Sequence, residues 1–150
     1  MTKRQPKGTP DGGQFAPDRK PPSDDLANSS IVMVQTFMGY KKWVRDGLLH
    51  RDDGPAMEWS DGNKMWYRDG LLHRDDGPAV ELTNGTKEWY RNGLLHRDDG
   101  PAMEDFSGTK KWYRDGVLHR DDGPAIEWDD GTKKWYRDGR PISPPEGGDL

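Results

Sequence analysis

A unit of 23 residues is repeated along this chain. Tryptophan recurs at this interval, glycine recurs four residues later, and every histidine of the sequence falls on the same period. The repeated residues are Trp43, Trp66, Trp89, Trp112 and Trp135; Gly47, Gly70, Gly93, Gly116 and Gly139; and His50, His73, His96 and His119. A period of about 20 to 50 residues is typical of arrays in which neighbouring units bury one another.

Each unit has the pattern of short β-strands joined by tight turns. Residues 87–91 alternate between two faces, as a strand requires. Asn92-Gly93 follows, and such a dipeptide permits positive φ at both turn positions of a hairpin. Leu-Leu-His-Arg forms the return strand, which the proline of Asp-Asp-Gly-Pro ends because it has no N–H to donate. A strand such as 56–59 begins next, and Asp61-Gly62 turns it back. We predict an all-β fold of tandem 23-residue hairpins in an elongated meander or solenoid-like sheet.

The alternation places the repeated Trp on one face of this sheet and the Tyr on the other. With at least two strands per unit, the array advances roughly 10 Å per repeat. We expect the five Trp to form a ladder, each burying roughly 200 Å² and contributing on the order of 5 kcal/mol as an upper bound. Such a ladder would supply the core of a chain that is only 30% hydrophobic.

The repeat divides the chain into four parts. Residues 1–30 carry glycine, proline and charge without periodicity, and we expect a disordered tail. Residues 31–42 align as a degenerate copy, which is typical of a capping unit. Residues 43–140 form the tandem repeats, and residues 141–150 form a loose C-terminal tail.

One unit departs from the others. Where the other copies have Trp59, Leu82 and Trp128, it has Asp105, with Phe106 one place later. A shift of one residue moves a side chain to the opposite face of a strand. We therefore expect a local bulge or an exposed Phe106.

Composition excludes several classes of function. The chain has no Cys, which excludes disulfides and zinc–thiolate sites. No run of about 20 apolar residues is present, so no membrane insertion is expected. No secretory signal follows the basic start, which favours a cytoplasmic location. The net charge of −4 disfavours binding to a phosphate backbone.

The motifs that resemble chemistry are better explained by the fold. His50-Arg51-Asp52 is similar to a kinase catalytic-loop motif, but the other kinase motifs are missing. Successive histidines would lie roughly 10 Å apart, too far to share a zinc ion. Paired aspartates such as Asp52-Asp53 offer too few oxygens for calcium, and we expect them to accept backbone N–H bonds in the turn, with Arg51 neutralising them. We expect no catalytic residue, no metal and no cofactor.

Residues 66–79, with an aromatic strand, an Asp-Gly turn, Leu-His and Gly, resemble the MORN-repeat variant. This resemblance covers about residues 31–140, and the inserted Arg-Asp-Asp departs from it. Proteins with this type of repeat include bacterial immunity or antitoxin proteins and phage proteins. Residues 6–17 also resemble a leader of actinobacterial and actinophage proteins, which bears on source rather than function.

These observations favour a non-enzymatic repeat protein that presents an elongated face to a protein partner, as a scaffold, an immunity or antitoxin-like protein, or a phage accessory protein. The alternative is a module that binds glycan or single-stranded nucleic acid through its Trp and Tyr side chains. Homo-oligomerisation stays open. Residues that every copy shares are explained by the fold, so partner specificity should lie where copies differ. The candidate partner-binding residues are Trp59, Leu82, Phe106, Trp128, Tyr67, Tyr90, Tyr113 and Tyr136.

Overall fold

The computed structural model describes residues 39–145, and the expectations for residues 1–38 and 146–150 lie outside this part of the chain. The described residues form β-structure without a helix, as predicted, so none of them forms a helix able to cross a membrane. The strands are β1 Tyr40–Lys42, β2 Val44–Arg45, β3 Leu48–Leu49, β4 Met57–Trp59, β5 Lys64–Met65, β6 Tyr67–Arg68, β7 Leu71–Leu72, β8 Val80–Glu81, β9 Lys87–Glu88, β10 Tyr90–Arg91, β11 Leu94–Leu95, β12 Met103–Glu104, β13 Lys110–Lys111, β14 Tyr113–Arg114, β15 Val117–Leu118, β16 Ile126–Glu127, β17 Lys133–Arg137 and β18 Arg140–Ile142.

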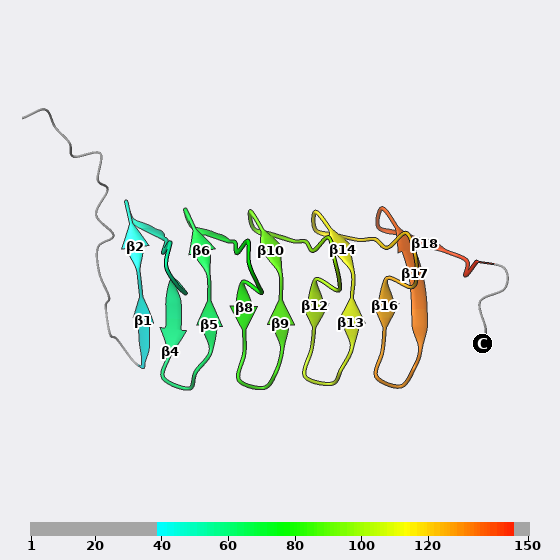
Figure 1. The fold of residues 1–150 in the computed structure, drawn as a ribbon, viewed down its shortest axis with the longest axis horizontal. Coiled ribbons are helices and arrows are strands. Elements are labelled where there is room, and N and C mark those ends of the chain that lie inside the picture. Colours follow the sequence, from blue (N-terminus) through cyan, green and yellow to red (C-terminus); the bar gives the residue numbers. More distant parts are fainter. Residues whose placement is uncertain (1–38, 146–150) are drawn as a thin grey trace, which may run out of the picture.

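The strands form one long antiparallel sheet with a row of hairpins along one edge (Figure 1). The ten-stranded sheet has the order β1-β4-β5-β8-β9-β12-β13-β16-β17-β18, so each unit adds two strands next to those of the previous unit. Four two-stranded hairpins, β2-β3, β6-β7, β10-β11 and β14-β15, complete the units. Regular structure continues to Ile142, two residues past the expected end of the repeats.

The hairpin turns follow from their Asp-Gly and Asn-Gly dipeptides. Asp69 has a φ of 50° and Gly70 a φ of 79°, and the same pair of positive angles recurs in the other units. Positive φ at both central residues is the requirement of a two-residue turn whose twist matches that of the flanking strands. The turn prediction is therefore confirmed.

Successive hairpins are also bonded to one another. The N–H of Gly93 donates to the carbonyl of Leu72 at 2.8 Å, and the N–H of Arg74 donates to that of Tyr90 at 3.3 Å. Equivalent bonds join the other units. Every unit is thus fixed to the next both in the main sheet and along the hairpin edge.

The core differs from the expected Trp ladder. Most of the buried side chains are small or polar: Ala56, Ala79, Ala102 and Ala125 are 0% exposed, and the four histidines are 1–8% exposed. Val80, Thr86, Thr109 and Ile126 are also buried. The repeated Trp side chains are only half-buried. In the described residues, the one aromatic ring pair is Tyr40 with Trp59. The ladder prediction is wrong because residues 39–145 form a single-layer sheet, in which no second layer covers the indoles.

The strand register assigns side chains to two faces. Directly paired residues of neighbouring strands point to the same side. We call one side the Trp face, because the alternation of side chains along each strand places the repeated Trp there. Its row of paired residues is Glu58, Lys64, Glu81, Lys87, Glu104, Lys110, Glu127 and Lys133. The other side, the Tyr face, carries Met57, Met65, Val80, Glu88, Met103, Lys111, Ile126 and Lys134 together with the Tyr of the repeats.

The divergent unit keeps the register of the others. Met103 pairs with Lys111 and Glu104 with Lys110, as in the equivalent strands, so no bulge forms. Asp105 accepts hydrogen bonds from the backbone N–H groups of Ser107 and Thr109 at 2.9 and 3.1 Å, which stabilises the turn. Phe106 is 74% exposed, the second of the two predicted outcomes.

Candidate binding surfaces

An arginine covers one face of each indole in the four complete units. The guanidinium carbon lies 4.0–4.1 Å from the ring centroid in the pairs Arg51–Trp43, Arg74–Trp66, Arg97–Trp89 and Arg120–Trp112. Trp135 has Ser143 at the equivalent position, beyond the last complete unit. A guanidinium over an indole is attracted by the ring quadrupole and also shields the ring from water. The Arg–Trp stack takes the place of the expected Trp–Trp contact.

Each stacked arginine is held by groups of its own unit. Arg74 donates from Nε to Asp76 at 2.9 Å and from Nη1 to the carbonyl oxygen of Pro78 at 3.2 Å and to Glu81 at 2.8 Å. A Cβ added to Gly77 would lie 2.9 Å from Cζ of Arg74, so glycine is required there for the guanidinium to approach. The Arg-Asp-Asp-Gly-Pro sequence thus acts as one unit that holds the guanidinium over the indole. Asp76 bonds mainly the Arg74 side chain, and not the turn backbone as the sequence had suggested.

The buried histidines connect loops and neighbouring hairpins. His50 Nε2 lies 2.9 Å from the carboxylate of Asp52, and its Nδ1 accepts the N–H of Asp69, in the next unit, at 3.0 Å. The same pattern recurs at His73, where Asn92 occupies the turn position. As expected, these side chains bond the Asp-Asp loops. The hydrogen bond from Arg45, followed by that of His50, lowers the pKa of Asp69.

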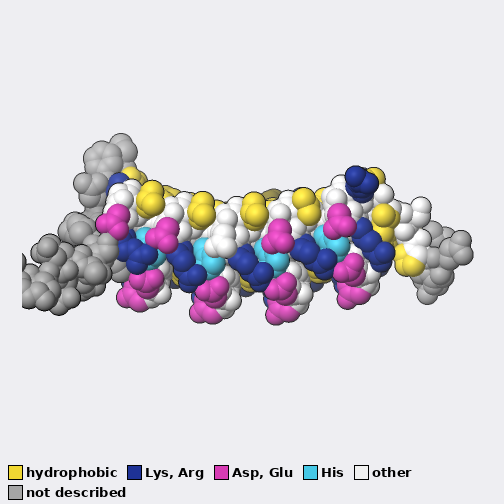
Figure 2. All heavy atoms as spheres, turned by 90° about the horizontal axis from the view of Figure 1, so that it is seen from above, with side chains coloured by type: hydrophobic (Ala, Val, Ile, Leu, Met, Phe, Trp, Pro, Cys, Tyr) yellow, Lys and Arg dark blue, Asp and Glu magenta, His cyan; other side chains and the backbone are white. Residues whose placement is uncertain are grey.

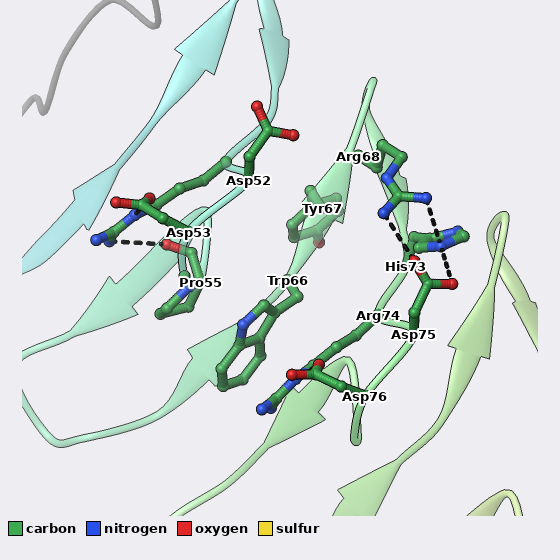
Figure 3. Close-up of a pocket in the computed structure, with 12 residues that line it drawn as sticks. Asp52, Asp53, Pro55, Trp66, Tyr67, Arg68, His73, Arg74, Asp75 and Asp76 are labelled. Atoms are coloured by element: carbon green, nitrogen blue, oxygen red, sulfur yellow. Dashed lines mark hydrogen bonds and ion pairs between the residues drawn. The ribbon is translucent and has the colours of Figure 1, made fainter.

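A groove separates each Arg-Asp-Asp loop from the next along the array. Three such grooves have volumes of about 530, 490 and 610 Å³ and equivalent linings. In the first groove, Figure 3 shows Trp66 between the loop with Asp53 and Pro55 and the loop with Arg74 and Asp76. Arg74 covers one face of this indole, which itself lines the groove.

The carboxylates of the groove walls are more exposed than the cations. The side chains of Asp53, Asp76, Asp99 and Asp122 are 81–84% exposed, and the stacked arginines are 20–24% exposed. The other arginines of the linings, Arg68, Arg91 and Arg114, are 50–53% exposed. Hydrogen bonds from the stacked Arg51 and Arg74 lower the pKa values of Asp53 and Asp76, so both are ionised near neutral pH. Seen from the hairpin edge, Arg and His form a band bordered on both sides by acidic side chains (Figure 2).

The Tyr face carries most of the strand positions at which the units differ. Tyr67, Tyr90, Tyr113 and Tyr136 are half-buried there, as are Trp59, Leu82 and Trp128. The hydroxyl of Tyr90 donates to Glu88 at 3.0 Å; burial, and then this carboxylate, raises the pKa of Tyr90 to about 12. Lys134 lies 5.4 Å from the ring centroid of Trp128. Toward the C-terminus, the Tyr face therefore carries Lys111 and Lys134 in addition to its apolar side chains.

The structure thus brings seven of the eight candidate partner-binding residues to one face. The eighth, Phe106, lies in the turn between β12 and β13, at the edge opposite the hairpins (Figure 1). Sequence reasoning missed the grooves, because it assigned the shared Arg and Asp entirely to the fold. The signal was the strict repetition of Arg-Asp-Asp-Gly-Pro, which begins eight residues after Trp43, Trp66, Trp89 and Trp112.

The described residues contain no group of three or more His, Asp or Glu side chains with the geometry of a metal site. No family model, curated protein or solved structure matches the chain.

Proposed function

We propose that this chain is a non-enzymatic repeat protein that presents its Tyr face to a protein partner. The single observation that carries this proposal is the gathering of the variable positions on that face. Along its central row the residues are Met57, Met65, Val80, Glu88, Met103, Lys111, Ile126 and Lys134. The opposite row repeats only Glu and Lys. Within the ten-stranded sheet, the residues that distinguish one stretch of the array from another therefore lie on one side.

The chemistry of the Tyr face favours a protein as its occupant. Half-buried Tyr, Trp and Met side chains lie over a single-layer sheet, and aromatic and Met side chains are enriched in protein interfaces. Lys111 and Lys134 add positive charge at one end. We infer a partner with an apolar surface that becomes acidic along its length. The roles of this class, by the MORN-variant resemblance, are scaffold, immunity or antitoxin-like protein, or phage accessory protein, in the cytoplasm.

A second candidate is a module that binds glycan or single-stranded nucleic acid. The observation in its favour is the half-buried Trp beside exposed Asp in each groove. The acidic chain disfavours the nucleic acid, because counterion release depends on cationic side chains.

The test uses neighbouring lysines as matched variants. Strand alternation places Lys111 and Lys134 on the Tyr face, and Lys110 and Lys133 on the Trp face. Tagged full-length chain is used to recover partners from an extract of its source cells, and the affinity for the recovered protein is then measured. We expect one stoichiometric protein, bound at least about tenfold more weakly by the Lys111→Glu/Lys134→Glu variant. The Lys110→Glu/Lys133→Glu variant should bind as the wild type does.

Equal effects of the two double variants would contradict the proposal. Salt-sensitive retention on single-stranded DNA, or binding to cell-wall glycan without a protein partner, would favour the second candidate instead.

A further inference from the structure

The three grooves of the Trp face recur with the period of the sheet. Each unit adds two strands to the ten-stranded sheet, and neighbouring strands lie about 4.8 Å apart, so equivalent grooves are spaced by about 9.6 Å. Their linings repeat the same Trp, Arg and Asp positions. A linear ligand that occupies them with identical groups must repeat at this distance.

Among regular peptide conformations, polyproline II has this period. It rises roughly 9.3 Å for each turn of three residues, so every third residue points to the same side. An α-helix returns to one face after seven residues and about 10.5 Å, a mismatch that grows to roughly 2 Å by the third groove. A β-strand repeats its faces about every 6.7 Å. For polyproline II, the mismatch with the groove spacing is only about 0.6 Å by the third groove.

The floor of each groove suits such a ligand. In the first groove, the indole of Trp66 belongs to the lining, and Arg74 lies over one of its two faces. Aromatic-lined grooves of this kind accept proline rings. The indole N–H of Trp66 has no hydrogen-bond partner among the described residues, and its edge lies toward the loop of Pro55 in Figure 3. Polyproline II has no internal hydrogen bonds, so its carbonyl oxygens are free to accept from this donor.

The charged side chains of the groove walls determine which charge on a ligand is favoured. Arg51 and Arg74 already donate to Asp53 and Asp76, to proline carbonyl oxygens and to Glu58 and Glu81. A carboxylate has about four acceptor sites, and those of the exposed Asp side chains are mostly unused. Each groove is lined by four Asp and three Arg, so its surplus charge is negative. A ligand side chain beside the wall should therefore be cationic.

We propose that the grooves of the Trp face bind a basic, proline-rich peptide segment in the polyproline II conformation, with one residue triplet in each groove. This site goes beyond the proposed function: its Trp lies on the opposite side of the sheet from the protein-binding face, although Tyr67, Tyr90 and Tyr113 also belong to the groove linings.

The test compares peptides of different period on the full-length chain. Fluorescence anisotropy measures the affinity of labelled (Pro-Pro-Arg)₃, (Pro-Pro-Arg)₁ and (Pro-Pro-Pro-Arg)₃. The last has the same three arginines and more proline, but it repeats at roughly 12.4 Å. We expect (Pro-Pro-Arg)₃ to bind at least about 100-fold more tightly than the single triplet, because linked sites act together. It should also bind at least about tenfold more tightly than the four-residue repeat.

Charge variants locate the site. Asp76 and Asp99 are 84% exposed in groove walls, so Asp76→Asn/Asp99→Asn should leave the fold intact and weaken binding of (Pro-Pro-Arg)₃ about 3- to 10-fold. The matched control, Asp61→Asn/Asp129→Asn, removes equal charge from turns at the opposite edge and should have no effect. Circular dichroism verifies the fold of both variants.

Three results would overturn this inference: equal binding of the two long peptides, equal effects of the two double variants, or no binding of (Pro-Pro-Arg)₃ at millimolar concentration. Binding of a β-linked oligosaccharide in place of the peptide would assign the grooves to glycan. None of these results bears on the lysine variants of the Tyr face, so the two proposals can fail separately.

Discussion

The stability of a unit should depend strongly on its Arg–Trp stack, and Arg97→Met tests this dependence. Arg97 lies 4.1 Å from the Trp89 centroid, an arrangement worth about 1 kcal/mol at a partly exposed site. Its Nη1 donates to the carbonyl of Pro101 at 3.3 Å, worth about another 1 kcal/mol. The ion pair with exposed Asp99 adds less than about 0.5 kcal/mol. Methionine restores part of the cover over the indole, so we expect a net loss of about 2 kcal/mol.

Urea unfolding followed by far-UV circular dichroism measures this loss. With a slope of about 2 kcal/mol per molar urea, the midpoint should fall by about 1 M. Asp99→Asn is the control, because it removes the ion pair but leaves the stack, and it should cost no more than about 0.5 kcal/mol. A cost below about 0.5 kcal/mol for Arg97→Met would refute the reasoning, and so would equal costs for the two variants.

Three further predictions follow from the same geometry. Gly100→Ala should cost about 1–3 kcal/mol in urea unfolding, because the new Cβ would lie 2.9 Å from Cζ of Arg97; a neutral effect would show that the stack is loose. Phe106→Ser should change the free energy of unfolding by less than about 0.5 kcal/mol, since the side chain is 74% exposed; a larger loss would mean that Phe106 packs against the array. Stability should fall as the pH is lowered from about 5 toward 2. Hydrogen bonds from Arg68, Arg91 and Arg114 lower the folded-state pKa values of Asp75, Asp98 and Asp121 below the ordinary 3.8. Their stabilisation is therefore complete above the unfolded-state pKa and is lost as the pH falls through the folded-state values; a melting temperature constant over this range would contradict it.

The sequence predicted those features of the fold that depend on local geometry. The positive φ values of Asp69 and Gly70, and the separation of Trp66 from Tyr67, follow from turn chemistry and strand alternation. The partner of Arg74 was not predictable in this way. Its long side chain has Asp76, Glu81 and the Trp66 ring within reach, and only the folded backbone decides among them.

The burial of the tryptophans was not predictable either. Alternation assigns Trp66 to a face, but it does not say whether another layer covers that face. Here no layer made of described residues does so, and the indole is half-buried under Arg74. The candidate sites were likewise predictable only in part. Differences between copies pointed to the Tyr face, whereas the grooves depend on the spacing of loops from neighbouring units.

The identical junctions between hairpins bear on how this protein can change its length. The bond from the Gly93 N–H to the Leu72 carbonyl has a counterpart at each junction, so no unit needs a particular neighbour. An in-frame duplication or deletion of one whole unit would keep these bonds at every hairpin junction and would lengthen or shorten the molecule by a single groove. Binding capacity could then evolve, or be engineered, in whole-number steps.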